Sequence, residues 1–198
     1  MKSIRLPLFA ITLLWTPLTA FAFVTAALDG VYVEGNAGKS FAINKKYPGR
    51  IFNSGFGWNV NAGYKFMEYL GVEAGYTRYA DTRILNSAGT AAAADTHYSY
   101  DLVAKLFFPL WGSGFEFFGK LGLARIHSFT HVINTKAAAL NHFTFKTGTN
   151  MASAPYFGGG LDYSILPNLQ ANVQWIRAKG TSHTGNLDLY SAGLSFLY

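Results

Sequence analysis

Residues 56–66 read Phe-Gly-Trp-Asn-Val-Asn-Ala-Gly-Tyr-Lys-Phe and alternate between two kinds of side chain without interruption. Even positions hold aromatic residues, valine or alanine, whereas odd positions hold only glycine, asparagine and lysine. Successive side chains of a β-strand point to opposite faces of the sheet. The stretch therefore predicts a strand with one apolar and one polar face. In a soluble sandwich the apolar face would be the core, but its aromatic bias recurs in many segments, which favours a lipid-facing surface.

The composition supports a membrane protein without spanning helices. Half of the 198 residues are hydrophobic and 17% are aromatic, but only 13% are charged, whereas soluble domains average about 25% charged residues. Beyond the N-terminal region, no segment approaches the roughly 18–20 unbroken apolar residues that a spanning helix needs. A transmembrane β-barrel reconciles these facts because lipid-facing and lumen-facing residues alternate along each strand. The length suggests one domain.

The N-terminus has the features of an export signal. Lys2 and Arg5 precede the apolar stretch Leu6–Leu18, and Ala20-Phe21-Ala22 has the small-x-small pattern of a cleavage site. We therefore expect a secretory signal peptide over residues 1–22 and an outer-membrane barrel domain over residues 23–198. An uncleaved N-terminal anchor is the alternative, which two prolines in the short apolar stretch disfavour.

Cysteine content and charge exclude several classes of function. The chain has no cysteine, which excludes a lipoprotein anchor, disulfides, thiol catalysis and cysteine metal sites. The formal net charge is +6 and falls to +4 without Lys2 and Arg5. This charge is too mild to indicate a nucleic-acid partner.

The alternation seen in residues 56–66 recurs along the mature chain. The eight expected strands cover residues 31–37, 56–66, 70–79, 98–106, 115–123, 155–163, 169–175 and 190–198. An even number suits a single-chain barrel, and closure matters because an open sheet edge in hydrocarbon would leave backbone groups without partners. The predicted fold class is therefore all-β, an eight-stranded antiparallel up-and-down transmembrane β-barrel.

The connections between these strands predict the orientation. Three short ones, over residues 67–69, 107–114 and 165–168, are typical of periplasmic turns. They alternate with longer stretches over residues 39–54, 80–97, 127–154 and 178–185, which we expect to be extracellular loops. The second and third loops either hang free or continue the strands above the membrane, and residues 91–94 and 136–140 are candidates for short helices.

Aromatic residues gather at both expected membrane interfaces, which amphipathic rings prefer. The periplasmic girdle would comprise Tyr64, Phe66, Tyr69, Phe107, Phe108, Trp111, Phe115, Tyr163 and Tyr198, and the outer one Tyr76, Tyr79, Tyr98, Trp175 and Tyr190.

Three glycine-aromatic segments resemble a known family. Gly63-Tyr64-Lys65-Phe66 runs through a tight turn into residues 70–76, and similar patterns occupy residues 118–124 and 157–163. Their order and spacing resemble the small outer-membrane β-barrel superfamily that includes OmpX and the OmpA transmembrane domain. The resemblance implies that Tyr190, Phe196 and Tyr198 of the last strand form the signal recognised by the barrel-assembly machinery. Because the chain stops at that strand, we do not expect the peptidoglycan-binding domain of full-length OmpA proteins.

Charged residues of both signs fall on lumen-facing positions. They are Glu34, Lys65, Glu73, Asp101, Lys105, Lys120 and Asp162. An eight-stranded barrel is just wide enough for side chains to fill it. We favour a charge-paired plug that satisfies buried polar groups, with a gated ion path as the alternative. We therefore expect the barrel to conduct poorly or not at all.

No pattern predicts catalysis, a cofactor or a metal. All five histidines fall in or beside the expected external loops, where solvated residues are a simpler interpretation than a metal site or pH sensor. His127-Ser128 invites comparison with lipid A deacylases, which have a His-x-Ser arrangement, but adjacent residues on a strand face opposite sides. We therefore expect no enzyme, and assign no catalytic, cofactor or metal residue.

The first external loop is basic. Lys39, Lys45, Lys46 and Arg50 occur with no acidic residue between them. Contact with the phosphates of outer-leaflet lipopolysaccharide is the favoured interpretation, and adhesion to an anionic host surface or glycan is the alternative.

These features favour a non-enzymatic outer-membrane barrel whose surface loops serve envelope integrity or adhesion. A narrow pore or small-molecule permease is the alternative, and a lipid A-modifying enzyme is a third hypothesis. The expected partners are outer-membrane lipid, lipopolysaccharide, the barrel-assembly machinery and a host or cell-surface ligand.

Overall fold

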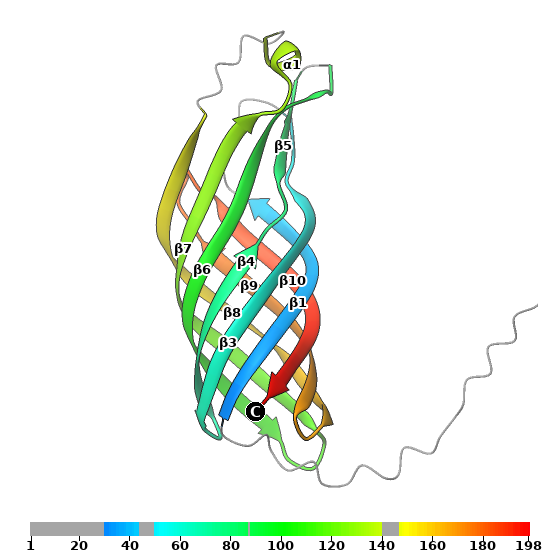
Figure 1. The fold of residues 1–198 in the computed structure, drawn as a ribbon, viewed down its shortest axis with the longest axis vertical. Helices are drawn as coiled ribbons and strands as arrows, with labels where there is room; N and C mark the ends of the chain where they lie inside the picture. The colour runs from blue at the N-terminus through cyan, green and yellow to red at the C-terminus, as the bar shows by residue number, and fades with distance from the viewer. Residues whose placement is uncertain (1–29, 44–49, 87, 140–146) are drawn as a thin grey trace, which may run out of the picture.

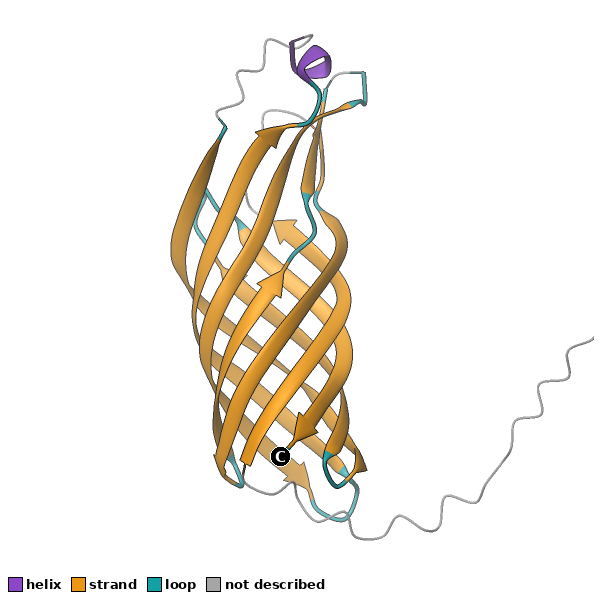
Figure 2. Ribbon diagram, in the orientation of Figure 1, coloured by secondary structure: helices purple, strands orange, loops and turns teal. Residues whose placement is uncertain are grey.

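The computed structural model describes residues 30–43, 50–86, 88–139 and 147–198. Nearly all of these residues belong to β-strands, with one short helix at one end (Figure 1, Figure 2). The strands are β1 (Gly30–Ile43), β2 (Arg50–Phe52), β3 (Ser54–Met67), β4 (Leu70–Arg78), β5 (Thr82–Leu85), β6 (Ala91–Leu110), β7 (Phe115–Val132), β8 (Gly148–Leu166), β9 (Leu169–Lys179) and β10 (Asn186–Leu197); the helix is α1 (Thr135–Ala139). The predicted signal peptide lies outside the described residues. Among those described, no helix is long and apolar enough to cross a membrane.

Eight strands close into a ring by antiparallel pairing. The order is β6-β4-β3-β1-β10-β9-β8-β7, and pairing of β6 with β7 completes the circle. Pairing of β1 with β10 joins the first and last strands over twelve residue pairs. The two short strands extend one side, since β5 pairs with β6 and β2 pairs with β5. The predicted eight-stranded up-and-down barrel is therefore confirmed.

The register shows how strongly the strands tilt. From Ala37 on β1, the pairings lead to Tyr98 on β6 by way of β3 and β4. In the other direction, through β10, β9, β8 and β7, they lead to Phe108, ten residues further along β6. A ten-residue stagger over eight strands corresponds to a tilt of about 40° at ordinary strand spacings. Residues paired directly across strands therefore lie at different heights along the barrel axis.

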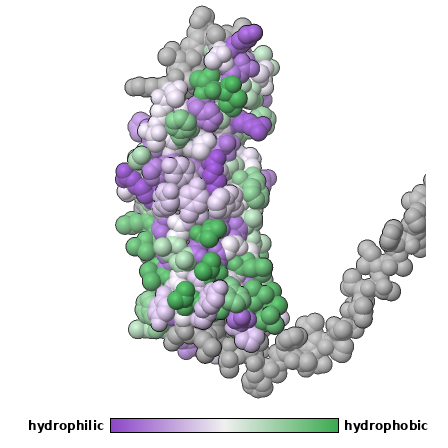
Figure 3. Space-filling model, in the orientation of Figure 1, coloured by the Kyte–Doolittle hydropathy of each residue, from purple (hydrophilic) through white to green (hydrophobic). Residues whose placement is uncertain are grey.

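Residues 56–66 have the two faces that their alternation predicts. Phe56, Trp58 and Val60 are exposed on the outer wall, whereas Asn59, Asn61 and the other polar positions point inward and are largely buried. Exposed outward positions and buried inward positions also alternate along the other seven strands of the ring, although some of their inward residues are apolar. Hydrophobic residues predominate on the lower part of the outer surface, and hydrophilic residues gather above them (Figure 3).

Short turns and longer connections lie at opposite ends of the barrel. Tight turns join β3 to β4, β6 to β7 and β8 to β9, at the end where β1 starts and β10 finishes (Figure 1). Gly112 and Gly114 adopt φ angles of 78° and 74° in the β6–β7 turn, a left-handed conformation that glycine adopts without steric cost. The longer connections lie at the other end, as the connection lengths predicted.

Several strands extend further than the alternation predicted. Residues 91–97 belong to β6, so the short helix considered at 91–94 is wrong, while α1 overlaps the second candidate region over residues 136–139. β7 continues to Val132 and β8 begins at Gly148, so much of the expected third loop is sheet. Beyond the part of the wall that contacts lipid, either face of the sheet can carry polar or apolar residues. The strands therefore stay paired there, although apolar and polar residues no longer alternate along them.

Candidate functional site

The barrel interior contains all seven of the charged residues predicted to face the lumen. Each is at least nine-tenths buried, and four of them meet in one cluster formed by Glu34 of β1, Glu73 of β4, Lys105 of β6 and Lys120 of β7. The four residues come from four different strands. Their side chains meet because inward positions of a small closed barrel converge on its axis. Asp162 joins the cluster at its edge.

Glu34 is the centre of this cluster. Its Oε2 accepts a hydrogen bond from Lys105 Nζ at 2.9 Å, and its Oε1 accepts one from Lys120 Nζ at 3.1 Å. Two amides, of Asn36 and Asn61, also donate to Oε1 at 2.8 and 3.0 Å. A fully buried carboxylate is stable only when it is paired and hydrogen-bonded in this way.

The second carboxylate balances the two lysines. Lys120 Nζ lies 2.7 Å from Glu73 Oε1, and the Tyr32 hydroxyl donates to Glu73 Oε2 at 2.9 Å. Lys105 Nζ lies 3.7 Å from the carboxylate of Asp162. The cluster therefore combines three carboxylates with two ammonium groups and fills the middle of the barrel.

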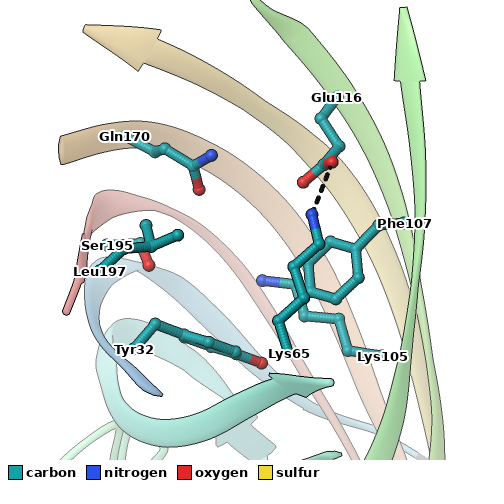
Figure 4. Close-up of a pocket in the computed structure, with 8 residues that line it drawn as sticks. All are labelled: Tyr32, Lys65, Lys105, Phe107, Glu116, Gln170, Ser195 and Leu197. Carbon is teal, nitrogen blue, oxygen red and sulfur yellow. Dashed lines mark hydrogen bonds and ion pairs between the residues drawn. The ribbon is translucent and has the colours of Figure 1, made fainter. Parts of the chain in front are cut away.

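Lys65 and Asp101 lie outside this central cluster. Lys65 Nζ pairs with Glu116 Oε2 at 3.0 Å nearer the periplasmic end (Figure 4). Glu116 points inward as its strand alternation predicts, but the sequence-based set of charged lumen residues did not include it. Asp101 lies on the other side of the cluster, where its carboxylate occupies space left by Gly75, and it forms no ion pair with another described residue.

Aromatic rings close the periplasmic end. Tyr32, Phe107, Phe118 and Leu197 form one buried apolar group. Lys105 Nζ lies 4.2 Å from the ring centroid of Phe118, and Lys65 Nζ lies 4.2 Å from that of Phe107, a distance at which cations are attracted to ring faces. The cavity beside them, lined by Tyr32, Lys65 and Phe107, has a volume of about 10 Å³, which is room for about one water molecule.

A layer of apolar side chains lies in the extracellular half of the lumen, next to buried polar residues such as Ser99, His97 and Ser128. Its members are Ala42, Tyr79, Val103, Ala124, Ile126, Ala154, Tyr156, Ile176, Ala178, Leu187 and Leu189. The lumen was predicted only from its charged residues, so this layer was not expected. The signal was present in Tyr156, Ile176 and Leu189, which occupy inward positions by strand alternation. The interior thus has an aromatic end, a charged middle and an outer half in which an apolar layer lies beside buried polar residues.

Two aromatic residues were assigned to the wrong side of the wall. Phe107 was expected in the periplasmic girdle and Tyr79 in the outer one, yet both side chains are buried inside the barrel. Phe107 follows the outward Leu106 on a strand that continues to Leu110, so alternation points it inward. Treating residue 107 as the start of a turn hid this consequence.

Comparisons with known proteins agree with this architecture. The model of the OmpA-like transmembrane domain family matches residues 26–197. The chain belongs to this family. A relative in Coxiella burnetii, an uncharacterized protein, is 25% identical over 213 residues and covers 85% of each chain.

Solved structures of other outer-membrane proteins have the same fold. The Neisserial surface protein NspA matches with a TM-score of 0.63 and 18% identity over 85% of this chain and 97% of its own. Ail of Yersinia pestis, in complex with the heparin analogue sucrose octasulfate, matches with a TM-score of 0.56 and 15% identity over 86% and 100%. OprG of Pseudomonas aeruginosa matches with a TM-score of 0.65 and 12% identity over 87% and 98%. These likenesses establish the fold of this OmpA-like barrel.

The adjacent His127 and Ser128 of this OmpA-like barrel face opposite sides of β7. Ser128 is fully buried, whereas His127 is half-buried on the outer wall and stacks on Tyr98 at a centroid distance of 4.8 Å. Ser128 Oγ donates to Asp95 Oδ1 at 2.7 Å, and the other oxygen of Asp95 lies 3.5 Å from His97 Nε2. In these two contacts the carboxylate of Asp95 meets both the serine and the imidazole, whereas in a hydrolase triad the imidazole contacts both the serine and the carboxylate.

The histidines do not share one environment. His97 is buried inside β6, His131 lies on the outer face of β7 beside Phe129, and His183 is exposed in the turn before β10; His142 lies outside the described residues. In the part of the chain that the structure describes, no group of three or more histidine or acidic residues is arranged to hold a metal ion.

The four basic residues assigned to the first loop do not all lie in a loop. Lys39 is part of β1 and points outward from the wall, and Arg50 is exposed on β2. Lys45 and Lys46 lie outside the described residues. The assignment of residue 39 to a loop was therefore wrong, because β1 continues to Ile43 above the lipid belt.

The expected assembly-signal residues lie on the outer face of the last strand. Tyr190 and Phe196 are exposed on β10, and Tyr198 follows it with 81% of its surface exposed. The backbone N–H of Tyr198 donates to the carbonyl of Val31 at 2.9 Å, so the C-terminus is joined to the first strand of the barrel.

Proposed function

We propose that this barrel is a non-enzymatic, non-conducting outer-membrane protein that acts through its external surface, in envelope integrity or attachment to anionic surfaces. The filled lumen carries this proposal. An ion would have to cross the aromatic end, the Glu34–Glu73–Lys105–Lys120 cluster and an apolar layer of Tyr156 and its neighbours. Breaking buried, paired charges is costly, and the apolar layer consists mainly of aliphatic and aromatic side chains, which replace little of the water around an ion.

Planar bilayer recordings test the closed lumen. Purified, refolded protein should give no steady conductance steps, whereas a general porin inserted from the same detergent should conduct. Swelling of vesicles in small sugars should likewise match that of protein-free vesicles. Reproducible steps of uniform size from the pure protein would overturn the proposal and favour the narrow pore.

The external surface offers a basic segment for an anionic ligand. Lys39 and Arg50 are exposed on β1 and β2, and Lys45 and Lys46 come between them in sequence. The similar protein Ail was crystallised with a sulfated heparin analogue, which makes heparin a suitable probe. Export through a cleaved signal peptide at residues 1–22 and assembly through the terminal strand complete the proposal.

Binding of whole cells that display the protein to immobilised heparin separates attachment from an envelope role. Attachment through the basic segment predicts binding that weakens with salt and is lost when Lys39, Lys45, Lys46 and Arg50 are all changed to glutamine. Lys136→Gln, in the exposed α1, provides the control. Binding that survives the fourfold change would exclude attachment through this segment and leave envelope integrity, which sensitivity to detergents after gene deletion would measure.

A further inference from the structure

Outward-facing charges begin at one height around the barrel wall. From the periplasmic turns upward, the described outer faces of the eight ring strands carry no charged residue until Lys39 on β1, Arg78 on β4, Arg125 on β7, Arg177 on β9 and Asp188 on β10. Once the ten-residue stagger is taken into account, these five lie within about 4 Å of one another along the axis, since strands tilted by about 40° rise about 2.5 Å per residue.

This level is the upper edge of the lipid-facing surface. The exposed apolar residues below it extend down to Val31, Phe66 and Phe115 near the periplasmic turns, a height of about 20 Å by the same rise per residue. Apolar bands of outer-membrane barrels are about 25 Å tall and end in aromatic girdles. Trp58, Trp175 and Tyr190 lie at the upper edge of this band. The five outward-facing charged residues therefore lie at the height of the lipid headgroups.

The four cations differ in how far neighbouring groups satisfy them. Arg78 pairs with Asp81 at 2.7 Å, and Arg125 donates to Ser153 Oγ at 3.0 Å. Arg177 is held by both oxygens of Asp188, each at 2.6 Å. Lys39, by contrast, has no ion pair with another described residue, and its Nζ lies 5.3 Å from the ring centroid of Phe41.

Lys39 lines a cleft on the outer wall where the first and last strands meet. Lys39, Phe41 and Ile43 of β1 and Asp188 and Tyr190 of β10 line this shallow, widely open cleft, which has a volume of about 520 Å³. Lys39 pairs with Tyr190 and Phe41 with Asp188 across the strands, and the Phe41 and Tyr190 rings meet edge to face at 5.9 Å. The cleft therefore has aromatic and aliphatic walls, with a lysine at one side.

The neighbouring strand extends this surface. Trp175 of β9 lies 6.4 Å from Tyr190 between ring centroids, and the Arg177 guanidinium lies 5.4 Å from the Trp175 ring. Arg177 neutralises Asp188, so the charge of Lys39 is not compensated within the cleft. The cleft therefore has a net positive charge. The lining residues face outward from the wall, and the cleft extends from headgroup height at Lys39 to about 10 Å above it at Ile43 by the same rise per residue.

We propose that this cleft is a specific binding site for a phosphorylated glycolipid of the outer leaflet. Lys39 binds a headgroup phosphate as a charged hydrogen-bond donor. Phe41 and Ile43, about 5 and 10 Å above Lys39 at the same rise per residue, pack against the sugars, while Tyr190, on the membrane side of Lys39, packs against the first carbons of the acyl chains. The position at the lipid edge, the positive charge and the apolar walls together favour an amphipathic anionic lipid over a soluble anion or polymer. This inference goes beyond the proposed function, since it requires neither a closed lumen nor attachment to other surfaces.

Native mass spectrometry of the folded barrel in mild detergent tests the site with bis-phosphorylated lipid A as the probe. We expect one tightly bound lipid A per barrel, an affinity about ten-fold lower in Lys39→Gln, and near-wild-type affinity in Lys39→Arg, which keeps the charge. Phe41→Ala should also weaken binding. Arg125→Gln removes a cation of the same height on the far wall and should leave this affinity unchanged.

Binding measurements with other ligands identify the molecule that supplies the phosphate. Dephosphorylated lipid A and phosphatidylglycerol should bind at least ten-fold more weakly, and inorganic phosphate at millimolar concentration should not displace lipid A. Equal losses in Lys39→Gln and Arg125→Gln would show unspecific attraction to a basic rim and would overturn the proposal. So would unchanged binding in both Lys39→Gln and Phe41→Ala. A heat-dependent gel shift shows whether each variant is folded, and none of these outcomes bears on whether the lumen conducts.

Discussion

The Glu34→Gln substitution tests the charged middle of the barrel most directly. It keeps the size of the side chain but removes its charge and one of its two carboxylate oxygens. In the native protein those oxygens accept hydrogen bonds from Lys105 and Lys120 at 2.9 and 3.1 Å, as well as from two asparagines. The amide can present its oxygen to only one of the lysines and turns an NH₂ group toward the other.

The expected loss of stability follows from these contacts. A hydrogen bond to a charged group contributes about 1.5–3 kcal/mol, and removing one partner of a buried ion pair costs about 3–5 kcal/mol because a charge is left without compensation. Glu73 still neutralises Lys120 at 2.7 Å, and Asp162 lies 3.7 Å from Lys105. These carboxylates limit the damage, so we expect Glu34→Gln to lower the free energy of unfolding by about 3 kcal/mol.

Equilibrium unfolding in urea, with the barrel in lipid vesicles and followed by tryptophan fluorescence, measures this change. The midpoint should fall with little change in slope, since the surface exposed on unfolding is the same. Glu68→Gln, which removes an exposed carboxylate from the β3–β4 turn, should change the free energy by less than about 0.5 kcal/mol. A loss below about 1 kcal/mol for Glu34→Gln would refute the view that paired charges hold the lumen together.

Further predictions concern backbone packing, assembly and closure of the barrel. In β1, a Cβ at Gly38 would overlap the carbonyl oxygen of Tyr190, whereas one at Gly35 would have no neighbour within 4 Å; urea unfolding should show Gly38→Ala destabilised by about 1–3 kcal/mol and Gly35→Ala nearly unchanged, and equal effects would contradict the packing. Tyr198→Ala should lower the amount of assembled barrel in the outer membrane, measured by surface labelling, more than Tyr64→Ala, which removes an exposed tyrosine of the periplasmic rim; equal amounts would remove the basis for the terminal signal. Unboiled protein should migrate differently from boiled protein on mild-detergent gels, and identical migration would argue strongly against a closed barrel.

Strand alternation predicted the faces of the barrel wall where lipid imposes it. In residues 56–66 every outward side chain is apolar and every inward one is glycine, asparagine or lysine, because hydrocarbon excludes charge and the lumen tolerates it. Above the membrane this constraint ends. Parts of the second and third expected loops are continuations of β6, β7 and β8, which was one of the two alternatives for these loops. Phe107 and Tyr79 were placed outside because their residue type outweighed their position in the strand.

The sequence by itself determined the class of fold, the number of strands in the ring, the ends at which short and long connections lie, and seven of the charged residues that face inward, since each follows from local alternation and connection length. Only the tertiary structure decided which side chains contact one another. Glu34, Lys105 and Lys120 are far apart in sequence and meet because the stagger of the closed sheet brings their strands to one height. The same stagger places Lys39 and Tyr190, from opposite ends of the chain, in one cleft. Register is a property of the whole ring, so no local pattern contains it.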